Sequence, residues 1–203
     1  MKTFYRCIIA DPPWSFNDKL DFSPDKGAEK HYSTLNVSQI KTLPVKSLAD
    51  PDGCVLALWV PSTMIREGLE VMEAWGFSFR QTYVWSKKTK NGKSSFGMGR
   101  LFRQCHEIAL IGINTTKVYK HLKSKSERSL CEAVNTKHSK KPYALHVSLE
   151  KMFPAGDKLE MFARRSRPGW DTIGNEVCHG EDIRETLADM NQEQVEFGIE
   201  VAR

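Results

Sequence analysis

The sequence predicts an α/β domain with a largely parallel sheet and helices on both faces. Short apolar runs of strand length alternate with segments whose apolar residues recur at helical spacing, a pattern typical of parallel α/β folds. The chain of 203 residues contains no internal repeat and is long enough to bury one substantial core. We therefore expect one domain over residues 1–203, with its ligand crevice at the carboxyl ends of the strands.

Five segments are predicted as strands. A continuous apolar run, or enrichment in β-branched and aromatic residues, marks each of them. They are Cys7–Ala10, Gly53–Val60, Gln81–Ser86, Glu107–Ile113 and Leu159–Ala163. The residues after the last strand, 170–176, are predicted as a loop.

Four helices are predicted from capping residues, prolines and the spacing of apolar residues. They cover residues 38–43, 62–75, 142–153 and 183–190. Asn36 or Ser38 is expected to cap the first helix, because a short polar side chain can accept a hydrogen bond from the first turn. Gly76 is expected to close the second helix as a left-handed terminating residue.

Charge is distributed unevenly behind a net charge of +5. Residues 87–103 hold six basic residues and no acidic one, whereas residues 117–141 hold eight basic and two acidic residues. With its glycines, the segment 87–105 is expected to be a basic mobile loop, and residues 177–203 form an acidic helical tail. Charge runs are often solvated faces, but basic segments interleaved with aromatic residues also match a surface that binds a polyanion.

Several protein classes are disfavoured by the composition. The sequence has neither an apolar stretch of membrane-spanning length nor a signal peptide. Its five cysteines are scattered without a C-x-x-C pair, and its histidines lack zinc-ligand spacing. We therefore expect a cytoplasmic protein with reduced thiols and no metal.

The most informative segment is Asp11-Pro12-Pro13-Trp14, which directly follows the first predicted strand. Its prolines fix φ and lack N–H donors, so the segment forms a stiff rim with a carboxylate, outward carbonyls and a flat ring. Such a rim suits a planar amine: the Asp11 side chain and the Pro12 carbonyl would accept its N–H groups, and Trp14 would stack on the base. The simpler alternative is a turn whose Trp fills the core. Burial of the Trp14 ring would contradict the stacking role.

This tetrapeptide resembles the signature of amino-group methyltransferases. Its Trp variant is similar to the N6-adenine methyltransferases, a family that includes the catalytic subunit of the mRNA N6-adenosine methyltransferase and compact bacterial and phage DNA enzymes. Further matching segments are His31–Leu35, Leu58–Val60, Trp75–Phe77, Val84–Lys87, His106–Gly112, Ser139–Pro142, Glu160–Arg164, Trp170 and Gly174–Glu176. The resemblance implies a Rossmann-like fold with a seven-stranded type of sheet, in which the catalytic half precedes the cofactor half.

The resemblance also implies the site residues. The catalytic residues are Asp11, Pro12, Pro13 and Trp14. The implied cofactor is S-adenosyl-L-methionine, and its binding residues are Asp11, Lys141, Phe162, Arg164, Ser166, Asn175 and Glu176. The substrate-binding residues are Tyr32, His106, Glu107 and four basic residues of the segment 87–103, namely Lys87, Lys88, Arg100 and Arg103. No metal is expected, because a sulfonium methyl donor is already activated.

The leading functional prediction is methylation of the adenine N6 amine in DNA. DNA is preferred because the chain resembles compact members without an appended RNA-binding module. The same chemistry on RNA, a non-catalytic nucleic-acid-binding subunit, and methylation of a protein or small-molecule amine are the alternatives; the intact Asp11 disfavours the non-catalytic one. Only ten residues precede Asp11, fewer than in many family members, so a homodimer or a partner subunit that completes the cofactor pocket stays open.

Overall fold

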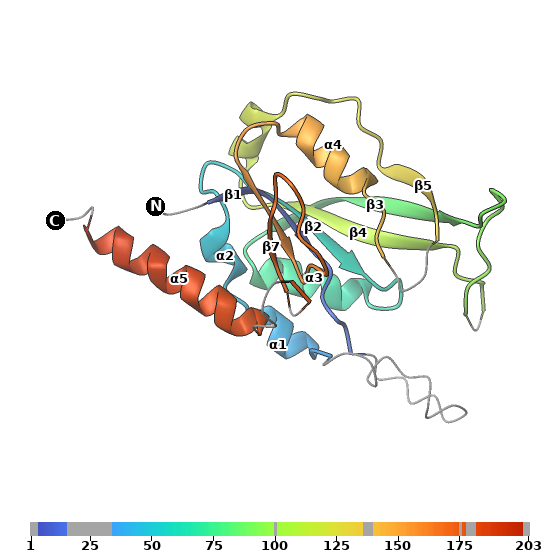
Figure 1. The fold of residues 1–203 in the computed structure, drawn as a ribbon, viewed down its shortest axis with the longest axis horizontal. Helices are drawn as coiled ribbons and strands as arrows, with labels where there is room; N and C mark the ends of the chain where they lie inside the picture. Colours follow the sequence, from blue (N-terminus) through green and yellow to red (C-terminus); the bar gives the residue numbers. More distant parts are fainter. Residues whose placement is uncertain are drawn as a thin grey trace.

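A seven-stranded sheet forms the centre of the molecule. The computed structural model describes residues 4–15, 34–99, 101–135, 140–174, 176–177 and 182–200, the last eight of these by their backbone alone. The strands are β1 (Tyr5–Ala10), β2 (Val55–Val60), β3 (Ser78–Lys88), β4 (His106–Ile113), β5 (Leu130–Val134), β6 (Asp157–Met161) and β7 (Asp171–Ile173). Their order across the sheet is β5-β3-β4-β2-β1-β6-β7 (Figure 1).

The strand directions confirm the largely parallel sheet. Only β4 opposes its neighbours, since it pairs antiparallel with both β2 and β3, whereas the other four pairings of the described strands are parallel. A hairpin-like connection from β3 permits this reversal, because antiparallel strands need no crossover helix. The carboxyl ends of six strands and the amino end of β4 therefore meet at one edge of the sheet, which we call the carboxyl edge.

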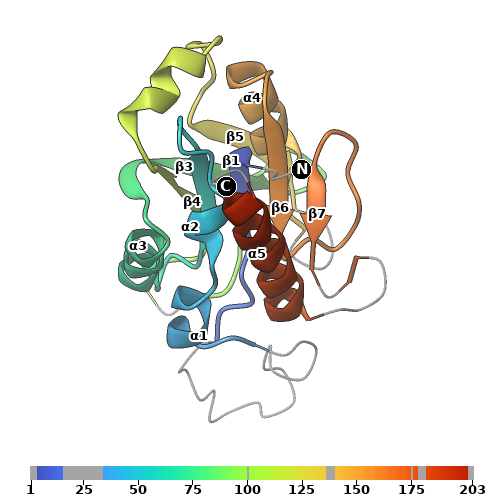
Figure 2. The ribbon, with the colours of Figure 1, turned by 90° about the vertical axis from the view of Figure 1, so that its left-hand side faces the viewer.

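Helices cover both faces of the sheet, as the sequence predicts (Figures 1 and 2). The helices are α1 (Val37–Lys41), α2 (Val45–Leu48), α3 (Ile65–Ala74), the 3₁₀ helix η2 (Thr116–His121), α4 (Ala144–Met152) and α5 (Ile183–Glu200). One core cluster contains residues of α1, α2, α3 and α5, and a second contains residues of α4 and η2. No described helix is both long and apolar enough to cross a membrane.

Some local predictions are confirmed and others are wrong. Asn36 caps α1 in a capping box with Gln39. The predicted loop 170–176 instead contains β7, whose three residues are too few to produce a periodic pattern and become a strand by pairing with β6. The edge strand β5 and the short helices α2 and η2 were also not predicted, because none carries a clear apolar period.

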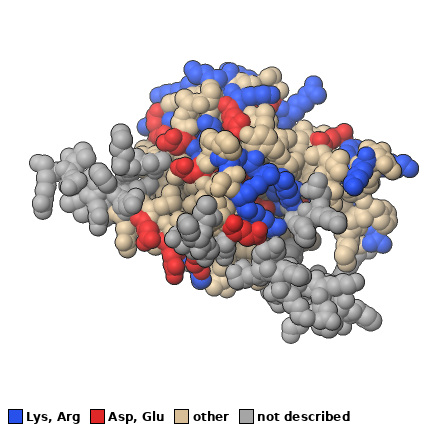
Figure 3. All heavy atoms as spheres, in the orientation of Figure 1, with Lys and Arg blue, Asp and Glu red and all other residues tan. Residues whose placement is uncertain are grey.

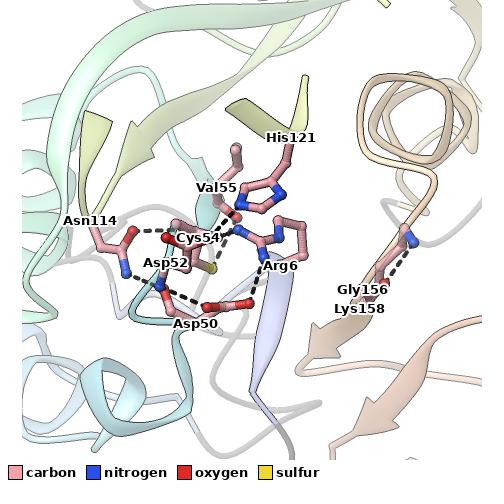
Figure 4. A network of polar contacts seen from close by, with 10 residues as sticks. Arg6, Asp50, Asp52, Cys54, Val55, Asn114, His121, Gly156 and Lys158 are labelled. Atoms are coloured by element: carbon pink, nitrogen blue, oxygen red, sulfur yellow. Dashed lines mark hydrogen bonds and ion pairs between the residues drawn. The ribbon is translucent and has the colours of Figure 1, made fainter. Parts of the chain in front are cut away.

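The opposite edge, at the amino ends of the parallel strands, contains a closed polar network (Figure 4). Arg6 on β1 pairs with Asp50 at 2.7 Å and donates to the Gly53 carbonyl. Asn114 donates to the Asp50 carbonyl and accepts from the Cys54 N–H. These bonds tie side chains to the main chain, so the loop that leads into β2 is fixed by them. We call these residues the amino-edge network.

Candidate active site

Four charged side chains form a chain of ion pairs at the carboxyl edge. The Lys141 ammonium lies 2.8 Å from Asp11 Oδ2 and 3.2 Å from Glu107 Oε2. Lys87 pairs with the other oxygen of Glu107. We call Asp11, Glu107, Lys87 and Lys141 the carboxyl-edge cluster.

Strand alternation explains why these residues meet. Ile9 and Ala109 belong to the core beneath α4, and side chains two residues apart point to the same face. Asp11, two residues beyond Ile9, and Glu107, two residues before Ala109, therefore face α4. Lys141 lies just before that helix and completes the cluster from above the sheet.

Electrostatics keep the Lys141 ammonium charged. Burial lowers the pKa of Lys141, but the carboxylates of Asp11 and Glu107 outweigh that effect and raise it above its ordinary value. The Lys141 ammonium also lies 5.5 Å from the centre of the Trp59 ring, a cation–π contact. Lys141 is therefore a fixed positive charge beside the Asp11 carboxylate.

The backbone after Asp11 forms the expected stiff rim. The Trp14 N–H donates to the Pro12 carbonyl at 2.9 Å, and the Leu35 N–H donates to the Pro13 carbonyl at 2.9 Å. A carbonyl oxygen has two lone pairs, so Pro12 keeps one for a further donor. The Asp11 side chain is 33% exposed, and only its Oδ2 contacts Lys141. Asp11 Oδ1 takes no part in the bond to Lys141, so it can accept a hydrogen bond from a ligand.

The stacking role predicted for Trp14 is wrong in this structure. Its ring belongs to the core cluster and only 6% of the residue is exposed. Its indole N–H donates to the Trp59 carbonyl at 2.9 Å. Trp14 therefore anchors the rim to β2, because a large amphipathic ring with a satisfied N–H is well suited to burial. The core-filling alternative describes the ring correctly.

Three of the predicted cofactor residues, Phe162, Arg164 and Glu176, follow the carboxyl ends of β6 and β7. Phe162 follows β6 with a φ of 61°, a left-handed conformation that is uncommon for a residue with a side chain. A Cβ at Gly174 would lie 2.5 Å from the Ala163 carbonyl oxygen, so only glycine fits this close approach. Arg164 Nε lies 3.6 Å from Glu176 Oε1, and 42% of each side chain is exposed.

The loop after Phe162 is attached to α4 by a second ion-pair group. Glu160 contacts His146 at 3.0 Å and Arg167 at 2.9 Å. Burial raises the pKa of Glu160, but these two partners outweigh it and lower the pKa below its ordinary value. Ser166, which lies within this loop, is exposed, and Asn175 lies outside the described residues.

The structure redistributes the predicted substrate residues. Glu107 joins the carboxyl-edge cluster, whereas His106 faces the opposite side of the sheet by strand alternation. Lys87 was predicted to contact substrate directly, but its side chain is 15% exposed and its ammonium is bound to Glu107. Lys88 pairs with the more exposed Glu132 at 2.8 Å, and the Arg103 guanidinium lies 4.9 Å from the centre of the Phe96 ring. Tyr32 and Arg100 lie outside the described residues.

Two residues of the site were missed by sequence analysis. Trp59, read only as part of a buried strand, lies beneath Lys141 and accepts the Trp14 N–H through its carbonyl. Gln104 accepts from Ser62 and donates to the His106 carbonyl, which fixes the chain as it enters β4. Neither role follows from spacing, because both depend on contacts across the sheet. No three metal-ligating side chains converge anywhere in the described part of the chain.

Comparisons with known proteins identify the family of this chain. The family model MT-A70 matches residues 5–176. The type II methyltransferase M.MunI of Mycoplasma sp. is 30% identical over 189 residues, which cover 85% of this chain and 78% of that protein. Mouse METTL4, an N(6)-adenine-specific methyltransferase, is 29% identical and human METTL3, an N(6)-adenosine-methyltransferase catalytic subunit, 25%; the matches cover 87% and 85% of this chain but only 38% and 28% of those proteins. The chain thus belongs to the MT-A70 family of N6-adenine methyltransferases.

Proposed function

We propose that this protein transfers a methyl group from S-adenosyl-L-methionine to the N6 amine of adenine in DNA. The observation that carries the proposal is the partly exposed Asp11 carboxylate, held at the carboxyl edge by Lys141 and, through it, by Glu107. This edge is where ligands bind in open α/β sheets. The family supplies the reaction class, and the geometry supplies a role for each residue.

The rim provides two acceptors for one amine. In the proposed complex, Asp11 Oδ1 and the remaining lone pair of the Pro12 carbonyl accept the two N6 hydrogens, so the nitrogen presents its lone pair. The nitrogen–carbon bond forms as the carbon–sulfur bond breaks, and the surplus N6 proton passes to Asp11 or to water. Lys141 keeps Asp11 oriented, and Pro13 keeps the backbone stiff. Orientation and fixed charge are the protein's contributions here.

The residues present fit the cofactor. S-adenosylmethionine supplies an activated methyl group when it is bound. The close approach of Gly174 to the Ala163 backbone leaves the turn beside Phe162 without a blocking side chain. The Glu176 carboxylate suits two ribose hydroxyls, and Arg164 suits a carboxylate. These assignments extend to Asn175 and Ser166 as predictions from the family pattern.

The choice of DNA as the proposed substrate rests on the relatives of this chain. M.MunI, a type II methyltransferase, is matched over 78% of its length, whereas METTL3, an N(6)-adenosine-methyltransferase catalytic subunit, is matched over 28% of its length. The adenosine-directed relatives make RNA the second candidate. Both substrates would present the same planar amine to Asp11, so the choice rests on contacts outside the rim.

The test is a methyl-transfer assay. Purified protein is incubated with S-adenosylmethionine carrying a labelled methyl group and with matched duplex DNA, single-stranded DNA and RNA of random sequence. Digestion to nucleosides then identifies the labelled base. We expect N6-methyladenine in DNA, and loss of the label with Asp11→Asn. Label in RNA alone would replace the substrate, and label in no nucleic acid, or full activity of Asp11→Asn, would refute the proposal.

A further inference from the structure

The loop between β3 and β4 exposes an unusual group of apolar side chains. Phe96 is 79% exposed, Met98 84%, Leu101 94% and Phe102 89%, the four highest values among the large hydrophobic residues that the structure describes. We call these four residues the apolar tip. Large exposed apolar patches are rare on soluble monomeric proteins. Where they occur, they commonly mark an interaction surface.

The apolar tip rests on a hydrogen-bonded base. The Lys87 N–H donates to the Cys105 carbonyl at 2.8 Å, and the Gly97 N–H donates to the Gln104 carbonyl at 3.0 Å. A Cβ at Gly97 would lie 2.4 Å from that same carbonyl oxygen, so the two limbs approach too closely for a side chain. The exposed residues are therefore presented by paired backbone.

A groove of about 520 Å³ lies between this loop and the end of β3. Lys87, Lys88, Asn135 and Gln104 supply polar groups to it, and Phe96 and Met98 supply apolar ones. Its volume falls within the range of small-ligand sites. A nucleotide has the same division, with a charged phosphate and an apolar base face.

Charge around the apolar tip favours a polyanion over an apolar protein surface. Residues 89–105 contain four basic residues and no acidic one. Blue Lys and Arg side chains flank uncharged ones at the end of the molecule where this loop projects (Figures 1 and 3). Lys88 pairs with Glu132, which is 60% exposed, and such surface pairs are weak enough to exchange for a phosphate.

The groove and the carboxyl-edge cluster share one residue, Lys87. Lys87 lines the groove and binds Glu107, which binds Lys141, the partner of Asp11. A strand whose adenine lies at Asp11 would thus place a neighbouring nucleotide near the groove.

We propose that this groove binds a nucleotide that flanks the target adenine, with the apolar tip contacting bases and Lys88 contacting a phosphate. Phe96 and Phe102 offer flat rings, on which bases of any identity can stack. The identity of the target base rests on the proposed function, whereas contact between the apolar tip and nucleic-acid bases does not.

The test compares two labelled strands of 15 nucleotides by fluorescence anisotropy. One is single-stranded DNA, and the other has the same phosphates but abasic residues throughout. We expect wild-type protein to bind the base-containing strand about 10-fold or more tightly, and the Phe96→Ala/Phe102→Ala variant to lose that preference. The salt dependence of the variant's affinity should equal that of wild type, because neither substitution removes a basic side chain. Tyr119→Ala is the matched control, because Tyr119 is an aromatic residue that is 53% exposed beside lysines on η2. This helix lies near the amino-edge network, where its His121 pairs with Asp52.

The outcomes separate the two proposals. A double variant that keeps the wild-type preference overturns the groove assignment. So does a wild-type dimer, seen by sedimentation without nucleic acid, that the double variant converts to monomers. Methyl transfer by wild-type protein with unaltered binding by the double variant refutes the groove alone, whereas a lost preference without any methyl transfer refutes the proposed function alone. If the alanine variant misfolds by circular dichroism, Phe96→Leu/Phe102→Leu, which keeps the apolar area but removes the rings, should show the same loss.

Discussion

The two edges of the sheet both carry buried or half-buried ion pairs, but they are built from different partners. In the amino-edge network, Arg6 and Asn114 bond to main-chain groups of the loop before β2 (Figure 4). In the carboxyl-edge cluster, the contacts of Lys141 and Lys87 described above join side chains to one another and to aromatic faces. Main-chain partners fix a loop, whereas side-chain partners can be exchanged for a ligand without unfolding the backbone.

Exposure follows the same division. The Arg6 side chain is 9% exposed, and its charge is enclosed by protein groups. The Asp11 side chain is 33% exposed, and its hydrogen bond with Lys141 uses only Oδ2. We infer that the amino-edge network serves stability and the carboxyl-edge cluster serves ligand binding. Substitutions at the two edges should therefore separate stability from activity.

The largest effect is expected for Asp11→Asn. The amide keeps the shape but loses the negative charge that accepts the amine hydrogens, so kcat for methyl transfer should fall by at least about 10²–10³-fold. The free energy of unfolding, measured in urea, should fall by only about 1 kcal/mol, because Lys141 loses one carboxylate partner but keeps Glu107. Asp189→Asn, an exposed carboxylate on α5, is the control and should retain full activity. Equal losses of stability and activity in Asp11→Asn would remove the distinction between the edges.

The opposite result is expected for Asp50→Asn. Removing one partner of the Arg6–Asp50 pair leaves a buried guanidinium without its counter-charge, so the free energy of unfolding should fall by about 3 kcal/mol. Activity per folded molecule, measured well below the melting temperature, should not change. Asp52→Asn is the control, because the Asp52–His121 pair is exposed and solvent screening makes its contribution small. A change in kcat for Asp50→Asn would show that the amino-edge network influences the site.

A smaller effect, with a defined pH dependence, is expected for Lys141→Gln. Because folding raises the pKa of Lys141, its stabilisation is fully present below the unfolded pKa of 10.5 and is lost as pH rises through the folded pKa. Near pH 8 the variant should be about 1.5 kcal/mol less stable than wild type. Urea unfolding from pH 8 upward should show that difference shrink only above pH 10.5. A difference that shrinks already between pH 8 and pH 9 would contradict the raised pKa.

The smallest effect is expected for Trp14→Phe. The ring stays in the core, but the bond from the indole N–H to the Trp59 carbonyl is lost, so stability should fall by about 1 kcal/mol. The Kd for an adenine-containing strand should be unchanged, because the buried ring does not contact the base. A higher Kd for Trp14→Phe at unaltered stability would restore the stacking role. It would also require the rim to open on binding.

Local chemistry in the sequence predicted much of the fold. Apolar runs located five of the seven strands, and Asn36 located the start of α1. Because Asp11 and Arg164 follow predicted strands, both were expected at the carboxyl ends of the sheet, whereas Lys141 was expected at the site only from the family resemblance. The strand β7 escaped prediction because it is defined by its partner β6 and not by its own three residues. The antiparallel direction of β4 could not be predicted either, because the apolar run of a buried strand does not specify in which direction the strand runs.

Asp11-Pro12-Pro13, by itself, determined that a stiff acidic rim ends the first strand, because proline restricts φ wherever it occurs. Tertiary structure alone decided which side chains meet that rim. It buried Trp14 against β2, turned His106 away from Glu107, and bound Lys87 to Glu107 instead of leaving it for a phosphate. Burial and pairing depend on what lies across the sheet, and a residue's neighbours along the chain do not specify its neighbours in space.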